Sequence, residues 1–427
     1  MTYEEAVKYI LDIPKFTKKN DREHTKMFLR YLKNPQERLK VIHVAGTNGK
    51  GSVCAYLDAM LRAQGKRVGL FTSPHLVKIN ERITVNGKAV SDESFCGVFE
   101  ETREAVRHMQ EEGLAHPTFF EFLFGMALLA FAEAGMEYAV IETGLGGRLD
   151  ATSAVEHPLV CVITSIGLDH REYLGNSLRE IAGEKAGIIR PGIPVFYAET
   201  SEESDCVIEQ IAREQGSSCK KIGKDAFEIL GIEDKHIAFS CSSDYYGNTT
   251  WKLNNTGTYQ PGNAILAMEV MRYLFEETGR RELWWEVLAD LKWPGRMEEI
   301  LPDVYVDGAH NISAVEAFVE SLPADGRGRI ILFSAVRDKD YGQMTEYLCR
   351  NAAADVYVVT HIDDRRGESA QRLADIFRKY TEQPVIVRES VEEALAYALS
   401  VQDGRRVYCL GSLYLTGLIK RLVQEEI

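Results

Sequence analysis

The sequence predicts an α/β protein of two domains, each built on an open sheet of mainly parallel strands. An apolar run at residues 41–44 has the composition of a buried strand and leads through a glycine-rich turn into a helical pattern. From residue 303 onward, strand-like and helix-like segments alternate regularly. With 427 residues, the chain is also longer than one hydrophobic core ordinarily holds.

The composition is that of a globular protein, with 45% hydrophobic and 27% charged residues. A formal net charge of −14 argues against nonspecific nucleic-acid binding. The longest apolar run, residues 122–132, is shorter than the roughly 20 residues that span a membrane, and the N-terminus has no apolar signal core. We therefore expect a cytoplasmic monomer with small-molecule partners. The eight cysteines form no CxxC pair, which predicts reduced, mostly buried thiols.

The glycine-rich turn is Gly46-Thr-Asn-Gly-Lys-Gly-Ser52. Its glycines let several backbone N–H groups point at one anion, and the N-terminus of the following helix adds partial positive charge. Lys50 supplies a mobile full charge for terminal phosphates, and the hydroxyl of Thr47 or Ser52 can reach a phosphate oxygen or its magnesium ion. This order of groups predicts a phosphate-binding loop and a P-loop NTPase-like N-terminal domain.

The turn departs from the common GxxxxGK[ST] pattern. Val44 stands where the first glycine would be, and Gly51 separates Lys50 from Ser52. An ordinary glycine-rich turn between a strand and a helix is the alternative, which the order of strand, lysine and hydroxyl disfavours.

The segments on either side of this loop have clear patterns. Two helices are expected within residues 1–40, and residues 66–72 form a strand that ends at Ser73-Pro-His-Leu76. Ser73 is either a simple turn residue or a ligand-binding one, because ligands bind at the carboxyl ends of parallel strands. Residues 80–87 predict a short hairpin or edge strand.

After a solvated helix at residues 93–112, Thr118-Phe-Phe-Glu121 begins a strongly apolar helix that runs to about residue 134. Thr118 and Glu121 have the spacing of a capping box. Phe119 and Phe120 could equally line a pocket for an aromatic ligand, and their spacing does not separate the two interpretations.

A buried strand at residues 138–143 places Glu142 near its end, before Gly144-Leu-Gly-Gly-Arg-Leu-Asp150. A carboxylate there, on a strand beside a phosphate loop, is a candidate for holding magnesium, and a surface carboxylate is the alternative. The next strand, residues 159–164, leads to Asp169 and His170. His170 is either a structural histidine or a ligand.

Lys185 lies on a helix in an apolar setting, where desolvation would make the neutral amine accessible. Alternatively it pairs with Glu184 or extends its ammonium to solvent. A strand is expected at residues 191–196, and residues 200–250 indicate only a helix near 204–214 and short strands. Tyr259-Gln-Pro-Gly-Asn263 caps a helix through residue 275, and another helix covers 281–291.

Trp293-Pro-Gly-Arg296 follows these two helices and marks the expected boundary between domains 1–293 and 294–427. Beyond it, five strands, each followed by an amphipathic helix, predict a smaller Rossmann-like domain. The expected strands are 303–307, 329–334, 355–360, 384–388 and 406–411. The chemistry indicated so far is ATP use by a kinase, a ligase or a nucleotide switch, and no spacing chooses among them.

Nine motifs in order along the chain resemble the folylpolyglutamate synthase/dihydrofolate synthase family, relatives of the Mur ligases. They are Gly46-Thr-Asn-Gly-Lys-Gly-Ser52, Thr72-Ser-Pro-His-Leu76, Thr118-Phe-Phe-Glu121, Glu142-Thr-Gly-Leu-Gly-Gly-Arg-Leu-Asp150, Leu168-Asp-His170, Glu184-Lys-Ala-Gly187, Pro261-Gly-Asn263, Trp293-Pro-Gly-Arg296 and Asp307-Gly-Ala-His-Asn311. The resemblance covers nearly the whole chain.

The resemblance implies a set of site residues. Magnesium would be held by Ser73, Glu142 and His170, with a carbamylated Lys185 assisting. ATP would be bound by Thr47, Asn48, Gly49, Lys50, Gly51, Ser52, Asn263, Arg296 and Asp307. Catalytic roles would belong to Lys50, Asp150, Lys185 and Arg296. The pterin-bearing substrate would lie near Thr118, Phe119, Phe120, Glu121, Arg148 and Asp150.

The implied reaction is transfer of the γ-phosphoryl group of ATP to a folate or dihydropteroate carboxylate, followed by attack of the amine of L-glutamate with release of ADP and phosphate. A Mur-type amino-acid ligase with another acceptor and a nucleotide-dependent switch are the alternatives. Two departures bear on substrate preference: Ser153 stands where the family usually has asparagine, and residues 16–24 lack the usual Gly-Leu-Glu-Arg run.

Overall fold

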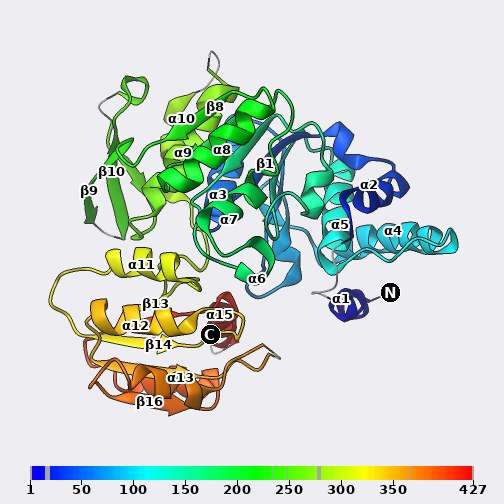
Figure 1. The fold of residues 1–427 in the computed structure, drawn as a ribbon. Helices are drawn as coiled ribbons and strands as arrows, with labels where there is room; N and C mark the ends of the chain where they lie inside the picture. The colour runs from blue at the N-terminus through cyan, green and yellow to red at the C-terminus, as the bar shows by residue number, and fades with distance from the viewer. Residues whose placement is uncertain are drawn as a thin grey trace.

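The computed structural model describes residues 2–14, 20–233, 235–247, 249–276, 280–364 and 366–425. Within them, the chain forms a large N-terminal part with two sheets and a smaller C-terminal part with one sheet, which lies below the N-terminal part in Figure 1. The expected α/β class, with a parallel-dominated sheet in each part, is confirmed. Residues 16–19 of the atypical N-terminal segment lie outside the described residues.

The central sheet of the N-terminal part has the order β4-β3-β2-β5-β1-β6-β7-β8. Its strands are β1 (Lys40–Ala45), β2 (Val68–Phe71), β3 (Ile83–Val85), β4 (Lys88–Ala89), β5 (Tyr138–Glu142), β6 (Val160–Ile163), β7 (Val195–Ala198) and β8 (Cys219–Ile222). The strands from β2 to β8 in this order are parallel, and β3 and β4 form an antiparallel edge. Strand β1 lies between β5 and β6, so the loop after it is flanked by the ends of both.

Helices cover both faces of this sheet, because alternate strand residues point to opposite sides and both faces are apolar. Ile42 and Val44 pack against α3 (Lys50–Ala63), α9 (Gln260–Leu274) and α10 (Arg281–Asp290). Val41, on the opposite face, joins a core built from α1 (Tyr3–Asp12), α2 (Arg22–Tyr31), α4 (Asp92–Glu111) and α5 (Phe119–Glu133). Ala45 joins a third core with α7 (Leu178–Ala186) and α8 (Glu202–Glu214).

The remaining elements of the N-terminal part are short or peripheral. An antiparallel sheet of order β11-β10-β9 packs against α9 and α10. The elements are β9 (Phe227–Glu233), β10 (His236–Cys241), β11 (Trp251–Leu253), α6 (Arg171–Leu174), η1 (Pro35–Arg38), η2 (Ile79–Arg82), η3 (Ala151–Ala154) and η4 (Asp244–Tyr246).

The C-terminal sheet has the order β12-β13-β17-β14-β15-β16, with only β12 antiparallel among these strands. Its strands are β12 (Glu298–Leu301), β13 (Val304–Val306), β14 (Arg329–Phe333), β15 (Val356–Thr360), β16 (Val385–Arg388) and β17 (Arg406–Leu410). One face is covered by α11 (Ile312–Glu320), α12 (Tyr341–Asn351) and α13 (Ala370–Phe377), and the other by α14 (Val391–Ser400) and α15 (Leu413–Glu425).

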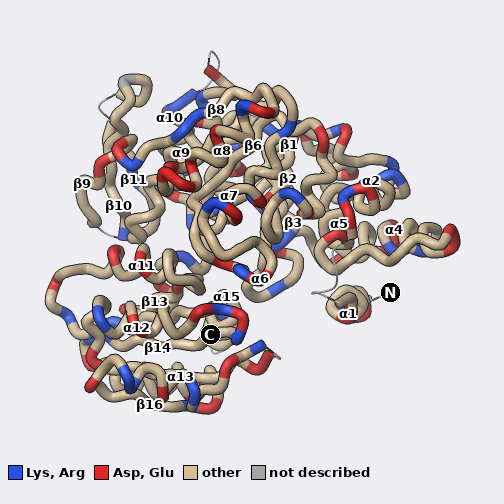
Figure 2. Tube along the Cα trace, in the orientation of Figure 1, with Lys and Arg blue, Asp and Glu red and all other residues tan. Residues whose placement is uncertain are grey.

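Some sequence expectations differ from the structure in detail. Helix α3 begins at Lys50, within the glycine-rich segment 46–52 that was expected to be a turn. Strand β7 begins at Val195 because the Ile193 N–H donates to the Arg190 carbonyl at 3.0 Å and closes a turn before it, and β12 was not expected. All eight cysteines are free, but the expectation that most are buried is wrong, because only Cys54, Cys161 and Cys409 are. The described residues contain no helix long and apolar enough to cross a membrane. Figure 2 shows basic and acidic residues interspersed over both parts of the chain.

Candidate active site

The candidate site is a cavity of about 1290 Å³ at the carboxyl ends of the central strands, walled by both parts of the chain. The turns after β1, β2, β5 and β6 all line it, as do residues 307–310 after β13. Parallel strands bring their carboxyl ends to one edge of a sheet, which is why segments far apart in sequence meet here.

The loop between β1 and α3 has the shape of an anion site. Gly49 precedes the helix with φ of 88°, and a Cβ there would lie 2.3 Å from the Oδ1 atom of Asn263, so only glycine fits. Lys50 folds back over the loop and donates to the carbonyls of Gly46 and Thr47, both at 3.1 Å. The Ser52 hydroxyl is buried and accepts a hydrogen bond from the amide of Gln260 at 3.2 Å.

Thr47 anchors the loop to the turn after β6. Its hydroxyl donates to the Gly167 carbonyl at 3.1 Å and accepts from the Gly167 N–H at 3.0 Å. The hydroxyls of Thr47 and Ser52, the two candidates for binding phosphate or magnesium, therefore both have hydrogen-bond partners within the protein.

Glu142 ends β5 beside the loop and is 4% exposed, so the alternative of a surface carboxylate is wrong. Its Oε1 lies 4.0 Å from the Nζ atom of Lys50, and its Oε2 accepts from the N–H of Ser73 at 3.1 Å. Burial raises the pKa of Glu142, against the opposing charge of Lys50. Glu142 and Ser73, both predicted from sequence, are thus in direct contact.

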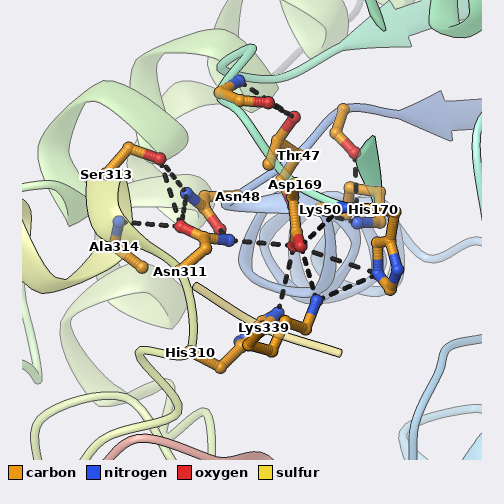
Figure 3. Close-up of polar contacts among 12 residues, drawn as sticks. Thr47, Asn48, Lys50, Asp169, His170, His310, Asn311, Ser313, Ala314 and Lys339 are labelled. Carbon is orange, nitrogen blue, oxygen red and sulfur yellow. Dashed lines mark hydrogen bonds and ion pairs between the residues drawn. The ribbon is translucent and has the colours of Figure 1, made fainter. Parts of the chain in front are cut away.

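His170 and Asp169 lie where the turn after β6 meets the C-terminal part (Figure 3). Desolvation, with the charge of Lys339 next in size, lowers the pKa of His170 to about 3, which keeps its ring neutral. Burial alone would raise the pKa of Asp169, but a hydrogen bond with His310 and the charges of His310 and Lys339 hold it below its usual range. Lys339 lies 3.2 Å from the Nε2 atom of His170.

Lys185 extends from α7 into the floor of the site. It is 4% exposed, and its Nζ atom donates to the Gly46 carbonyl at 2.7 Å. Desolvation, with the nearby charge of Lys50 second, lowers the pKa of Lys185 to about 7, so the expected access to the neutral amine is supported. Extension to solvent is wrong, because the side chain of Lys185 is buried. Pairing with Glu184 is wrong too, because Glu184 pairs instead with Arg148 at 3.4 Å.

Asp150 closes the glycine-rich turn after β5. One carboxylate oxygen accepts from the N–H groups of Gly144 and Leu145 at 3.0 and 2.9 Å, and the other from the N–H and hydroxyl of Thr152 at 3.0 and 2.6 Å. These contacts fix the shape of the turn, and a catalytic role for Asp150 stays a prediction. Arg148 in the same turn is exposed.

The start of α5 forms the predicted cap and also borders the cavity. Thr118 and Glu121 form the predicted capping box, and buried Glu121 also accepts from Thr25 and Asn20, both at 2.8 Å. The four residues from Thr118 to Glu121 also line the cavity. The capping geometry therefore holds Phe119 and Phe120 at the cavity wall.

Asp307, Arg296 and Asn263 line the cavity near the phosphate loop. Asp307 is buried and accepts from the hydroxyl of Tyr259 and the N–H groups of Met297 and Ala309, each at 2.8 Å. Desolvation raises its pKa, although the charge of Arg296 opposes the shift.

Two matches to family models cover most of this architecture: the Mur ligase middle domain over residues 44–271 and the Mur ligase glutamate ligase domain over residues 295–413. The chain is also 38% identical to a dihydrofolate synthase/folylpolyglutamate synthase of Bacillus subtilis over 358 residues, which cover 81% of this chain and 82% of the relative. The chain belongs to the folylpolyglutamate synthase/dihydrofolate synthase family.

Solved structures agree with this membership. A folylpolyglutamate synthase from Mycobacterium tuberculosis complexed with ADP and AMPPCP has a TM-score of 0.89 and 28% identity, over 99% of both chains. E. coli FolC in complex with DHPP and ADP has a TM-score of 0.85 and 27% identity, over 100% of this chain and 98% of that chain. The protein is therefore an ATP-dependent ligase of this family.

Most of the residues predicted for this ligase line the cavity, but sequence reasoning missed other cavity residues, among them the cations Arg82 and Lys339. Arg82 is buried, with its guanidinium 5.4 Å from the ring centre of Phe119, and Lys339 reaches Asp169 and His170. Arg82 lies in the segment that was expected to be a short hairpin or edge strand. Lys339 lies in the turn after β14, and only its position after an expected strand could have pointed to it.

The described residues contain no group of three or more His, Cys, Asp or Glu placed to hold a metal ion. The predicted magnesium set includes only two such residues, Glu142 and His170, together with the hydroxyl of Ser73. This finding therefore leaves the magnesium prediction untested.

Proposed function

We propose that this ligase uses magnesium and ATP to activate the terminal carboxylate of a reduced folate, and also that of dihydropteroate, as an acyl phosphate that the amine of L-glutamate then attacks. The observation that carries the proposal is the convergence of Lys50, Glu142 and Lys185 on one phosphate loop, in a cavity that also holds Arg296 from beyond the expected boundary. Carboxylate and amine do not condense in water, so the carboxylate must first be activated.

The positive groups suit phosphoryl transfer. Lys50 would turn from the loop carbonyls toward the terminal phosphates, and Arg296, which lines the cavity near the loop, would also face them. Preorganised cations stabilise the charge that spreads over a transferring phosphoryl group.

The donor set fits magnesium. The carboxylate of Glu142 keeps unused lone pairs, the hydroxyl of Ser73 is a hard oxygen donor, and the ring of His170 is neutral, which is the form that binds metals. These three residues would hold the ion, which supplies charge neutralisation for the phosphates when bound.

Lys185 suits carbamylation. Its neutral nitrogen would add to the carbon of CO₂ and lose one proton, which forms an anionic carbamate. The product would replace a repelling cation beside Lys50 with an attracting oxygen donor.

The lining of the cavity supports a place for the acceptor at the start of α5. Phe119 and Phe120 line the cavity wall, where a pterin would pack, and Glu121 lies next to them. We also infer that residues 1–293 and 294–427 are the two domains, that the ligase is monomeric, and that it works in the cytoplasm.

One assay tests the acceptor. Purified protein receives ATP, magnesium and L-glutamate with tetrahydrofolate or with dihydropteroate, and phosphate release is followed. We expect release with tetrahydrofolate and with dihydropteroate. If neither stimulates release while a nucleotide-linked muramyl acceptor does, the Mur-type alternative replaces the proposal. ATP hydrolysis without dependence on any acceptor would favour a nucleotide switch.

A further inference from the structure

A network of buried polar contacts joins the phosphate loop to the C-terminal part (Figure 3). The side-chain amides of Asn48 and Asn311 exchange two hydrogen bonds of 3.0 Å, one in each direction. Asn48 also donates to the hydroxyl of Ser313 at 3.0 Å. Asn311 is the N-cap of α11, where its Oδ1 accepts from the N–H of Ala314, so helix geometry fixes its position.

Asp169 is the centre of this network. Its Oδ2 accepts from the Nδ2 atom of Asn311 at 3.0 Å, and the Nε2 atom of His310 lies 3.5 Å from the same oxygen. Its Oδ1 accepts from the Nζ atom of Lys339 at 2.5 Å. All three partners come from the C-terminal part, on the segments that follow β13 and β14.

The ion pair between Asp169 and Lys339 is desolvated, because their side chains are only 8% and 7% exposed. Breaking such a pair from one side leaves an uncompensated buried charge, so the two groups strongly favour staying together. Asp169 belongs to the N-terminal part and Lys339 to the C-terminal part, so the ion pair forms when the C-terminal part packs against the phosphate loop.

On the N-terminal side of this contact, hydrogen bonds join the phosphate loop to the turn after β6. The backbone carbonyl of Asn48 accepts from the hydroxyls of Thr164 and Ser165 at 2.7 and 3.2 Å, and Thr47 is bonded both ways to Gly167. The phosphate loop and the turn that carries Asp169 therefore move together when the C-terminal part docks.

We propose that Asp169 and Lys339 are positioning residues whose ion pair holds the C-terminal part against the phosphate loop. The pair thereby fixes the positions of Asn48 and His170 for phosphoryl transfer. Neither residue needs to touch the substrate in this role. The activity half of the proposal rests on the proposed ligase function, whereas the docking half does not.

The test compares Lys339→Met with Arg350→Met. Arg350 lies on α12 in the same part of the chain, and its pair with Glu346 is exposed, so it serves as a matched control. Lys339→Met should lower kcat at least tenfold while the KM for ATP changes less than threefold, because most of the loop that binds phosphates stays intact. Small-angle X-ray scattering with an ATP analogue should show a larger radius of gyration for Lys339→Met alone. Lys339→Arg should restore part of the lost kcat and part of the smaller radius of gyration.

A double-mutant cycle sharpens the result, because Asp169→Asn combined with Lys339→Met should lose no more kcat than the worse single variant. A Lys339→Met protein with the kcat of the parent would overturn the proposal. So would a tenfold loss of kcat with an unchanged scattering curve, since Lys339 would then act on substrate directly. If the parent itself ligates no folate, the ligase function fails, while the scattering comparison still decides the docking role.

Discussion

Replacing Lys185 with methionine should make the protein more stable, and more so at low pH. The substitution keeps most of the side-chain length but removes an ammonium that is 4% exposed and has no carboxylate at hydrogen-bond distance among the described contacts. The carbonyl of Gly46 loses one donor but keeps Lys50 at 3.1 Å. The dominant change is therefore the removal of a desolvated charge.

The size of the effect follows from the pKa of Lys185, which falls from an ordinary 10.5 to about 7. Each pKa unit corresponds to about 1.4 kcal/mol, so burial of the charged form costs roughly 4 to 5 kcal/mol below about pH 7. Loss of the hydrogen bond to Gly46 offsets about 1 kcal/mol of this. We expect Lys185→Met to raise the free energy of unfolding by about 3 kcal/mol near pH 6.

The pH dependence has a definite sign. Because the folded-state pKa lies below the unfolded-state value, the unfolded chain binds more protons between about pH 7 and 10.5, and the parent protein gains stability as pH rises through this window. The advantage of Lys185→Met should therefore be largest below about pH 7 and shrink toward about pH 10.

Urea denaturation in CO₂-depleted buffer across this pH range measures the difference directly. Added bicarbonate should stabilise the parent but not Lys185→Met if the carbamate forms, because the carbamate turns the repulsion from Lys50 into attraction. An advantage that is absent, or that grows with pH, would refute the reasoning about desolvation. Activity provides a separate check, since the loss in Lys185→Ala should be restored only by a small added carboxylate.

Two further predictions concern the loop and the start of α5. Lys50→Ala should abolish ligation and Glu142→Gln should remove most of it with an unchanged circular dichroism spectrum, so near-normal turnover of either at saturating magnesium would contradict the assignment. Thr118→Ala should cost about 1 kcal/mol of stability in urea denaturation through loss of its cap and should raise the KM for the folate acceptor. Ser91→Ala at the exposed N-cap of α4 should cost a similar amount with no change in KM, and equal KM effects would place the acceptor elsewhere.

The sequence was most informative where local signals agreed with one another. The apolar run of β1, the glycines of the loop and the helical pattern after it predicted the phosphate loop without any tertiary information, and the capping box at Thr118 formed as its spacing indicated. By contrast, β12 is four half-buried residues that pair antiparallel with β13, and such an edge strand has no long apolar run to mark it. Pro191 and Gly192 form a turn closed by the Ile193 N–H on the Arg190 carbonyl at 3.0 Å, so the expected strand begins later than its apolar residues suggested.

Sequence alone thus determined the α/β class, the family motifs and the residue types of the site, because periodicity, capping and glycine placement are properties of short segments. Only the tertiary structure decided which alternative held at Glu142 and at Lys185. Lys185 could have paired with Glu184, but the packing of α7 against the loop buries its ammonium at the Gly46 carbonyl. Lys339 had no signal of its own, since its partner Asp169 is 170 positions away. Burial and charge depend on contacts between distant segments, and those contacts exist only once the two parts of the chain have packed together.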